Sequence, residues 1–513
     1  MAEIVNNKLI AKNAAILYFR MIITMFVGLY TSRVLLQALG IEDYGIYNVV
    51  GGFVSMFSLL SGALQSAIGR FLTYELGKGD IRRLKKVFST STSVILGLCV
   101  IAILATETIG LWYINNKMIL PLNRLYAANW VFQFSIVSFV ITIVNTTFQS
   151  CILSHEKMNI YAYMAIFDAF AKLIICYLIL ISSYDRLIVY SVLFCMISII
   201  DQLISVWYCS KSFEECTFRF EFDNKLFKEI FGFAGWTFVG SSASILRTQG
   251  AALLLNAFGG PIVNAANGIA TNVSNVVLGF VSNFTMAFNP QIVKLFASGE
   301  YIILNRLIFL SSKFSYFLMY LISLPILLNT NYILNLWLGE VPQYTVEFTR
   351  WMFVMLLSET ITRPLMTLKS ATGRIKNYQL IVGSILLLML PISYIGLKMG
   401  MSVMIVVIVN GLTAVIAASV RIFLINGDFP GWSIIAFLRE VVVKALLVSI
   451  SSAIVPLIIS SFIPEGVERF LITLLTSLIF TLISVFFLGC SVTERQYVMT
   501  RISEYFRNKR LYL

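Results

Sequence analysis

Charged residues are scarce in this sequence. Only 12% of its 513 residues are Asp, Glu, Lys or Arg, whereas 58% are hydrophobic. Soluble domains average about 25% charged and about 45–50% apolar residues. A soluble chain of this composition could not cover its own surface with polar groups. The composition therefore excludes a soluble globular protein and predicts a chain whose surface meets lipid.

Motifs for metal, nucleotide and catalytic chemistry are also missing. The sequence holds one histidine, His155, and its seven cysteines form no Cys-X-X-Cys pair, so no metal site and no cofactor are predicted. Most cysteines lie in or beside apolar runs and are interpreted as small buried hydrophobic residues. The segment 77–79 lacks the first glycine and the following Ser or Thr of a phosphate-binding loop. No motif suggests an enzyme, and a transporter of this kind would draw on an ion gradient or on the gradient of its substrate.

Long apolar runs fill the chain instead. A membrane-spanning helix needs about 20 mostly apolar residues, and these runs are continuous rather than alternating, which favours helices over a barrel. The first run is too long and too interrupted by charge for a signal peptide, so it is interpreted as a retained helix. The predicted fold class is an all-α integral membrane protein of about fourteen transmembrane helices. Their approximate ranges are 13–39, 45–70, 87–113, 124–150, 159–182, 187–208, 229–257, 262–289, 308–329, 346–370, 378–397, 401–425, 441–461 and 469–490.

The basic residues between the predicted helices are distributed unequally. Roughly 23 Lys and Arg fall in connections on one side and 6 on the other, which places both termini in the cytoplasm. This bias explains most of the net charge of +13, so no nucleic-acid partner is predicted, and anionic membrane lipid adds to the attraction. The segment after Val498 is basic and amphipathic, and we expect it to lie along the cytoplasmic membrane surface.

An internal repeat with an offset of about 220 residues organises the chain. Gly40 corresponds to Gly260, and the loop 76–80 corresponds to the loop 296–300. Each copy holds six helices, and an even number gives both copies the same topology, as in transporters with parallel repeats. The sequence predicts two pseudo-symmetric six-helix lobes, at 1–210 and 211–430, followed by two further helices and the amphipathic tail at 431–513.

Each lobe has one helix with a polar face. The helix 262–289 carries Asn267, Thr271 and Asn275 at helical spacing, and the helix 45–70 carries Asn48 and Gln65 on the equivalent face. Small and polar residues allow close packing of membrane helices. Alternatively, the two faces line a water-accessible cavity in which amides and hydroxyls meet sugar hydroxyls. Each interpretation can hold in a different turn of the same helix.

Ionisable residues within a span cost about 2.5–3.5 kcal/mol each, so each needs a partner or a purpose. Asp168 and Lys172 are four residues apart, as are Glu359 and Arg363, a spacing that allows an ion pair within one helix. Alternatively, Asp168, Glu359 and the isolated Asp201 are carboxylates that couple transport to H⁺ or Na⁺. Four further residues lie near the predicted cytoplasmic ends and are expected to snorkel toward water; these are Arg70, Lys313, Lys369 and Arg421.

Three intramembrane arginines have no acidic residue three or four positions away, namely Arg20, Arg33 and Arg247. Arg247 lies near the middle of its helix and shares a face with Trp236. A guanidinium group matches two phosphate oxygens at once, so we expect Arg247 and Arg20 to face an anionic substrate. The alternative is a partner on another helix, such as Asp201. The candidate substrate-binding residues are Arg20, Arg33, Lys172, Trp236 and Arg247, together with the polar residues of the two helices above.

The segment 32–45 resembles the first helix and turn of the bacterial polysaccharide (O-antigen type) flippases. Its residues 32–40 read Ser-Arg-Val-Leu-Leu-Gln-Ala-Leu-Gly, and Asp-Tyr-Gly follows at 43–45. Arg70-Phe71 and the loop 77–80 are similar to that family too. These flippases belong to the multidrug/oligosaccharidyl-lipid/polysaccharide exporter superfamily.

The resemblance implies a definite function in the bacterial plasma (inner) membrane. It implies alternating-access transport of an undecaprenyl-pyrophosphate-linked oligosaccharide from the cytoplasmic to the outer leaflet. A cationic central cavity would bind the lipid-linked oligosaccharide, with possible H⁺ or Na⁺ coupling and other polysaccharide assembly proteins as partners.

Two other functions stay open from the sequence. An ion-coupled exporter of cationic drugs would need unpaired carboxylates in the first lobe, where the first helix offers Arg20 and Arg33 but no acid. A membrane glycosyltransferase or polysaccharide polymerase would need a large external loop, and the longest here, near 329–345, is modest. The acidic pair Glu42-Asp43 resembles one found in some glycosyltransferases, but its turn is so short that we interpret the pair as helix capping.

Overall fold

The computed structural model describes residues 7–55, 58–116, 124–217, 223–428, 430–496 and 499–500. Within these residues the chain is helical and contains no strand. The chain forms two compact units, which are treated separately below. Side chains are not described for a few further positions inside the first helix, among them Arg33 and Asn48. The predicted amphipathic tail lies outside the described residues.

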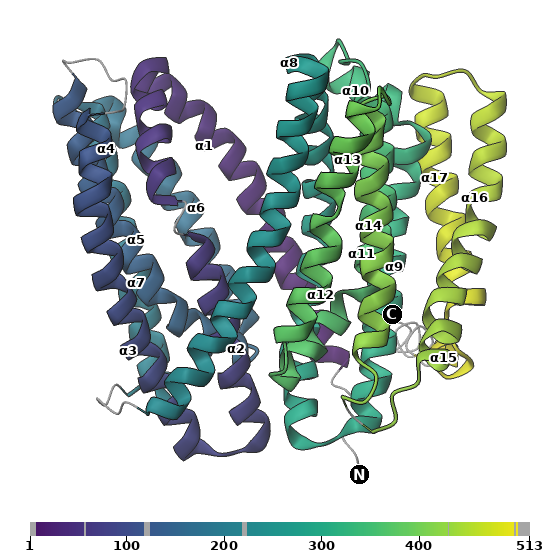
Figure 1. Ribbon diagram of the computed structural model, residues 1–513, viewed down its shortest axis with the longest axis horizontal. Coiled ribbons are helices and arrows are strands. Elements are labelled where there is room, and N and C mark those ends of the chain that lie inside the picture. Colours follow the sequence, from purple (N-terminus) through teal and green to yellow (C-terminus); the bar gives the residue numbers. More distant parts are fainter. Residues whose placement is uncertain are drawn as a thin grey trace, which may run out of the picture. The chain divides into compact units, whose positions relative to one another are not determined.

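The first unit comprises Met1–Ser242, Met286–Glu300 and Ser370–Gln379. A core of apolar side chains joins its helices, with Phe88, Ile152 and Ile230 almost fully buried. In chain order its helices are α1 (Asn7–Ser55), α2 (Ser58–Lys78), α3 (Ile81–Ala105), α4 (Leu111–Asn116), α5 (Leu125–Ser154), α6 (Met158–Ile181), α7 (Arg186–Ser212) and part of α8 (Asn224–Ser298) (Figure 1).

The second unit comprises Ala243–Thr285, Tyr301–Lys369 and Leu380–Leu513. Its helices after α8 are α9 (Tyr301–Leu328), α10 (Thr330–Leu338), α11 (Thr345–Thr372), α12 (Lys376–Leu387), α13 (Met389–Lys398), α14 (Met404–Leu424), α15 (Ile434–Phe437), α16 (Lys444–Phe462) and α17 (Val467–Ser484). The C-terminal pair α16 and α17 packs against α9, where Tyr316 and Tyr320 hydrogen-bond Ser449.

Two glycines interrupt the longest helices at equivalent places. Gly40 breaks α1 at φ 79° and ψ 171°, and Gly260 breaks α8 at φ 75° and ψ −174°. Only glycine adopts this backbone region without strain. Gly79 and Gly299, which also correspond in the repeat, have φ values of 72° and 79°. A glycine with positive φ therefore recurs 220 residues later at both pairs of positions that the internal repeat aligns.

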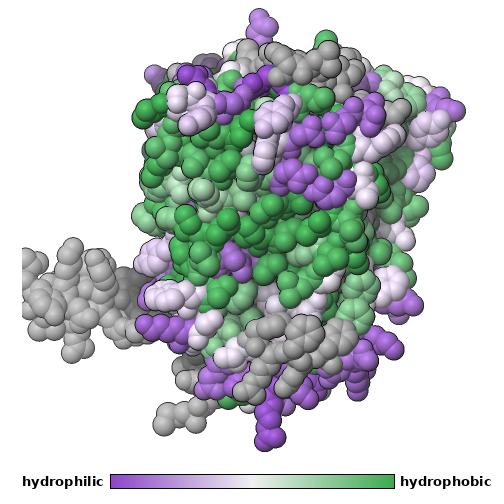
Figure 2. All heavy atoms as spheres, turned by 90° about the vertical axis from the view of Figure 1, so that its left-hand side faces the viewer, coloured by the Kyte–Doolittle hydropathy of each residue, from purple (hydrophilic) through white to green (hydrophobic). Residues whose placement is uncertain are grey.

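The outer surface of the helices is apolar. On α3, Leu96, Val100 and Ile101 are 42–63% exposed. Figure 2 shows the side of the molecule where α3 and α4 lie, and a hydrophobic band crosses it between two hydrophilic ends. Ten helices of the described part are long and apolar enough to cross a membrane. The predicted fold class, an all-α multi-pass membrane protein of about fourteen transmembrane helices, is confirmed.

Candidate functional site

A cluster of three arginines and one glutamate lies on α8, α11 and α14 of the second unit. The Nη1 atom of Arg247 on α8 donates to Oε1 of Glu359 on α11 at 3.1 Å. Arg363, one turn further along α11, donates to the hydroxyl of Ser282 at 3.3 Å and lies within electrostatic reach of Glu359 and Arg421. This arrangement brings together charges that are far apart in the sequence.

Burial makes the charges of this cluster costly. Arg247 is 7% exposed and Arg421 is 5% exposed. Arg421 donates to the hydroxyl of Thr362 at 3.2 Å. Glu359 pairs with Arg247 and lies within electrostatic reach of Arg363, and Arg363 lies within reach of Arg421, so three guanidinium groups and one carboxylate leave an excess of positive charge. The Nε atoms of Arg247 and Arg421 are buried and have no hydrogen-bond partner among the described residues. Buried donors of this kind need an explanation, and an anionic ligand would satisfy them.

Two expectations about these residues were wrong. Glu359 pairs with Arg247 on a neighbouring helix instead of with Arg363 in its own helix, because the closer packing of α8 gives the carboxylate a buried partner. Arg421 does not snorkel, since its position on α14 faces the protein interior. The sequence held a signal for this: Ala414, Ala417 and Ala418, which lie on the same helical face, are also buried. Small residues at such spacing mark a packed face.

A second group of charges lies on α6 and α7 of the first unit. Lys172 Nζ and Asp168 Oδ2 are 2.8 Å apart, so the ion pair allowed by their spacing forms. The carboxyl group of Asp201 on α7 lies within electrostatic reach of Asp168 and Lys172. The ammonium group of Lys172 also lies 5.0 Å from the centre of the Phe194 ring. The two carboxyl groups and the amine therefore form one cluster of ionisable groups between α6 and α7.

Arg20 is half-buried on α1 of the same unit. Its guanidinium carbon lies 4.9 Å from the centre of the Tyr161 ring on α6, a cation–π distance. The alternative for Arg247, an acidic partner on another helix, is realised by Glu359 and not by Asp201.

The polar faces of α2 and α8 contribute partly to packing. Gln65 on α2 hydrogen-bonds Gln149 on α5 at 3.5 Å. On α8, the hydroxyl of Thr271 donates to the Asn267 carbonyl at 2.7 Å and contacts a methionine sulfur on α11. Asn267 is buried, whereas Asn275 is exposed. The packing interpretation therefore fits most of these positions, and Asn275 is free to meet solvent or ligand.

Trp236 belongs to the first unit. The Lys376 ammonium lies 5.3 Å from the centre of its ring. One turn later in α8, Gly240 allows close packing, because an added Cβ would stand 1.9 Å from the Gln379 side chain. This stretch of α8 thus has local packing partners. The side chains of the predicted substrate-binding residues Arg33 and Asn48 are not among those that the structure describes.

The other basic residues expected to snorkel also have protein partners. Lys369 binds the carboxylate of Asp428 at 2.7 Å. Arg70 donates to the carbonyl oxygens of Ser370 and Ala371 at 3.2 and 3.0 Å. These basic side chains bind carbonyl and carboxylate oxygens of the protein instead of water, because the protein oxygens offer hydrogen bonds of fixed geometry. The snorkelling prediction was wrong for these residues as well.

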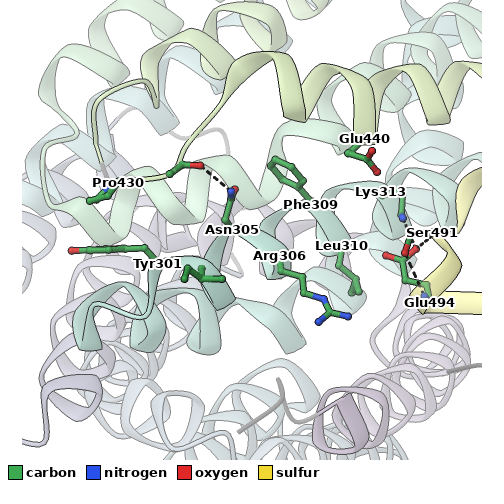
Figure 3. Close-up of a pocket in the computed structure, with 12 residues that line it drawn as sticks. Tyr301, Asn305, Arg306, Phe309, Leu310, Lys313, Pro430, Glu440, Ser491 and Glu494 are labelled. Carbon is green, nitrogen blue, oxygen red and sulfur yellow. Dashed lines mark hydrogen bonds and ion pairs between the residues drawn. The ribbon is translucent and has the colours of Figure 1, made fainter. Parts of the chain in front are cut away.

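Lys313, the fourth of this group, lines a cavity of about 380 Å³ beside α9. Figure 3 shows Lys313 turned toward Glu494, and their side-chain atoms are 2.7 Å apart. Asn305 donates to the Gly431 carbonyl at 3.1 Å across the same cavity. Lys313 and Glu494 neutralise each other, and Glu440 pairs with Lys444, so this cavity is a weaker candidate for a substrate site.

A further ion cluster contains Asp43, which the sequence analysis interpreted as a helix-capping residue. Arg124, which precedes α5, pairs with Asp43 on α1 and with Asp185, which precedes α7. Asp185 also accepts hydrogen bonds from the amides of Leu187 and Ile188. Burial alone would raise the pKa of Asp185, but these hydrogen bonds hold it below its usual range. Asp43 therefore has a structural role in this cluster.

The fold is shared with solved transporters of the multidrug/oligosaccharidyl-lipid/polysaccharide exporter superfamily. A multidrug-resistance (MATE) transporter in its bent conformation matches with a TM-score of 0.71 at 13% identity, over 84% of this chain and 96% of that one. A superfamily transporter from Pyrococcus furiosus, described as having a binding pocket of reverse polarity that suggests a different function, matches with a TM-score of 0.68 at 13% identity, over 83% and 96%. At this identity the likeness defines the fold class, a helical transporter fold.

The sequence itself identifies the family. The model of the polysaccharide biosynthesis protein family matches residues 10–296, more than half of the chain. The chain therefore belongs to the polysaccharide biosynthesis protein family, as its resemblance to polysaccharide flippases predicted. No curated protein matches it.

Proposed function

We propose that this protein is a flippase that moves an undecaprenyl-pyrophosphate-linked oligosaccharide from the cytoplasmic to the outer leaflet of the bacterial plasma membrane by alternating access. The observation that carries the proposal is the cluster of Arg247, Arg363 and Arg421, which contains a single carboxylate, that of Glu359. An intramembrane cationic cluster is costly unless it has a function. Membership of a polysaccharide biosynthesis family and a transporter fold support the same conclusion.

The chemistry of such a substrate fits the cluster. A pyrophosphate with a glycan cannot cross hydrocarbon unaided, because burying unpaired polar and charged groups costs many kcal/mol. Guanidinium groups bind phosphate oxygens in pairs. In this proposal Arg363, the most accessible of the three arginines, makes the first contact with the pyrophosphate, and Arg247 joins after leaving Glu359.

Ion coupling would use the charges of α6 and α7. Two carboxylates close together favour protonation of one of them, and Asp168 and Asp201 lie within electrostatic reach of each other. We propose that protonation of this pair, with Lys172 as its counter-charge, is linked to the transport cycle. The same proposal includes the orientation with both termini in the cytoplasm. It also includes the division into lobes at 1–210 and 211–430, with the two further helices after 430.

An ion-coupled multidrug exporter is the second candidate. It is favoured by the carboxyl pair Asp168–Asp201 in the first lobe and by the fold similarity to multidrug-resistance transporters. A drug-efflux assay in a sensitised host separates the two functions. The multidrug function predicts resistance that depends on Asp168, whereas the flippase function predicts no change in resistance and an accumulation of lipid-linked glycan on the cytoplasmic side when the gene is deleted.

The test of the binding role must separate substrate contact from neutralisation of Glu359. Arg247→Gln is expected to abolish surface polysaccharide at normal protein level, and Arg247→Lys to restore part of it. The decisive variant is the double substitution Arg247→Gln with Glu359→Gln, which removes both charges of the pair. If Arg247 binds substrate, the double variant stays inactive; if it only neutralises Glu359, the double variant regains transport. Arg306→Gln, at an exposed position outside the cluster, is the matched control and should transport normally.

A further inference from the structure

Five side chains with metal-binding chemistry meet where α5 and α7 end. Cys151 belongs to α5 and Cys209 to α7, and both are fully buried. The short helical turn Glu214–Cys216 follows α7 and brings in Glu215 and Cys216, which are 3% and 5% exposed. His155 caps α5. These residues lie up to 65 positions apart in the sequence, so their spacing gives no metal-binding motif.

The donor atoms of this cluster point at one another. The thiolate-forming sulfurs of Cys151 and Cys216 and a carboxylate oxygen of Glu215 all lie within 4.8 Å of one another. The Cys209 thiol donates to the Phe148 carbonyl at 3.6 Å and lies within electrostatic reach of Cys216 and Cys151. Zinc–sulfur bonds of about 2.3 Å place neighbouring sulfurs of a tetrahedral site about 3.8 Å apart. The donor atoms of Cys151, Cys216 and Glu215 therefore need to approach one another by only about 1 Å to bind an ion, and Cys209 is the neighbouring fourth ligand.

His155 holds the carboxylate in place. Its Nε2 atom and Oε1 of Glu215 are 2.6 Å apart, and its ring stacks on Phe213 with centroids 4.0 Å apart. The second carboxylate oxygen can then turn toward the sulfurs. Histidine–carboxylate contacts of this kind orient the ligands of metal sites.

We propose that Cys151, Cys209, Cys216 and Glu215 bind one Zn²⁺ ion in tetrahedral coordination, and that His155 positions Glu215. A buried carboxylate beside three thiols is a set of ligands for a divalent cation with affinity for sulfur, and the cation would balance the charge that these groups carry when deprotonated. On binding, the three thiols release their protons to solvent and no electron transfer takes place. The proposed orientation puts this end of the helices in the reducing cytoplasm, where clustered cysteines favour metal binding over disulfides.

The ion would have a structural purpose. It would link the turn after α7 to the end of α5, and so hold the chain in place where it leaves α7. This proposal concerns neither the arginine cluster nor transport directly. Its failure would leave the proposed flippase function unaffected.

Metal content of the purified full-length protein tests the proposal. After Zn²⁺ loading and removal of loosely bound metal, elemental analysis should find one zinc per chain in the wild type. The triple variant Cys151→Ser, Cys209→Ser, Cys216→Ser should contain none. The matched control Cys99→Ser, Cys176→Ser, Cys195→Ser also replaces three buried cysteines, but away from the cluster, and it should keep the ion. His155→Gln should keep the stoichiometry and lose about 10–100-fold in affinity in a chelator competition.

A spectroscopic measurement avoids dependence on the folding of the serine variant. Co²⁺ titrated into the wild type should give the intense sulfur-to-metal and ligand-field bands of tetrahedral thiolate coordination, and Zn²⁺ should remove them. Absence of these bands, a disulfide between two of the three cysteines in peptide mass analysis, or equal zinc in both triple variants would each overturn the proposal.

Discussion

The charge balance around Glu359 predicts an asymmetry between two substitutions. Glu359 pairs with Arg247 and lies within electrostatic reach of Arg363, which in turn lies within electrostatic reach of Arg421. Glu359→Gln removes the negative charge, leaves Arg247 without its partner and leaves the repulsion between Arg363 and Arg421 unopposed. Arg247→Gln removes one positive charge and leaves Glu359 with Arg363 nearby. The first change should therefore destabilise the protein more than the second.

The expected size follows from the geometry of the pair. Unit charges 3.1 Å apart attract with about 5 kcal/mol at an effective dielectric constant of about 20. Removing one partner of a buried ion pair typically costs about 3–5 kcal/mol. Glu359→Gln should lie at the upper end of this range because it also leaves the repulsion between Arg363 and Arg421 unopposed. Arg247→Gln should lie below it, because Glu359 keeps Arg363 within electrostatic reach.

Unfolding of the purified protein in mixed micelles measures both changes. The free energy of unfolding against SDS fraction, together with the midpoint of thermal unfolding, should rank wild type above Arg247→Gln and Arg247→Gln above Glu359→Gln. The double variant should be more stable than Glu359→Gln alone, since it removes one repelling charge. An equal loss in the two single variants, or a larger loss in Arg247→Gln, would show that the arginines do not act as one cluster.

Two further predictions concern other parts of the chain. Burial alone would raise the pKa of Glu494, but the hydrogen bonds from Lys313 and a backbone amide hold this pKa below its usual value. The ionised carboxylate therefore stabilises the fold at neutral pH, and this contribution is lost as pH falls from about 5 through the lower pKa of the folded state. The thermal midpoint of Glu494→Gln should fall less with acidification than that of the wild type. Gly260→Ala should cost about 1–3 kcal/mol because Gly260 occupies a backbone region essentially restricted to glycine. Gly268→Ala, on the same helix with open space around it, should be neutral or slightly stabilising, and a loss of equal size at Gly268 would contradict the argument from the backbone angle.

The membrane architecture could be predicted from the sequence because it depends on local properties. Apolar runs of span length determine helices that cross lipid, and the repeat at an offset of 220 residues was visible in its glycines. Gly40 and Gly260 then proved to share a backbone conformation. The breaks within helices were not predicted, such as the division between α12 and α13, because they depend on packing that composition does not record.

The charge partners could be predicted only where they were close in sequence. The spacing of Asp168 and Lys172 indicated their ion pair correctly, whereas the same spacing in Glu359 and Arg363 did not. A helix face restricts which residues can meet, but the neighbouring helix decides which of them do. Arg247 and Glu359 are separated by 112 positions, and no local pattern could connect them. The cysteine cluster was missed for the same reason.

The pairing of Arg247 with Glu359 bears directly on how such a carrier could complete its cycle. A ligand shifts a conformational equilibrium only through its different affinity for the two states, and three unneutralised arginines would strain the empty protein. In the proposed mechanism Glu359 takes the place of the phosphate when no substrate is bound, so the empty carrier can return at a tolerable electrostatic cost. The pyrophosphate then competes with Glu359 for the same guanidinium groups, and the carboxylate regains them when substrate leaves. A carboxylate in this position lowers the affinity for substrate, which favours its release into the outer leaflet.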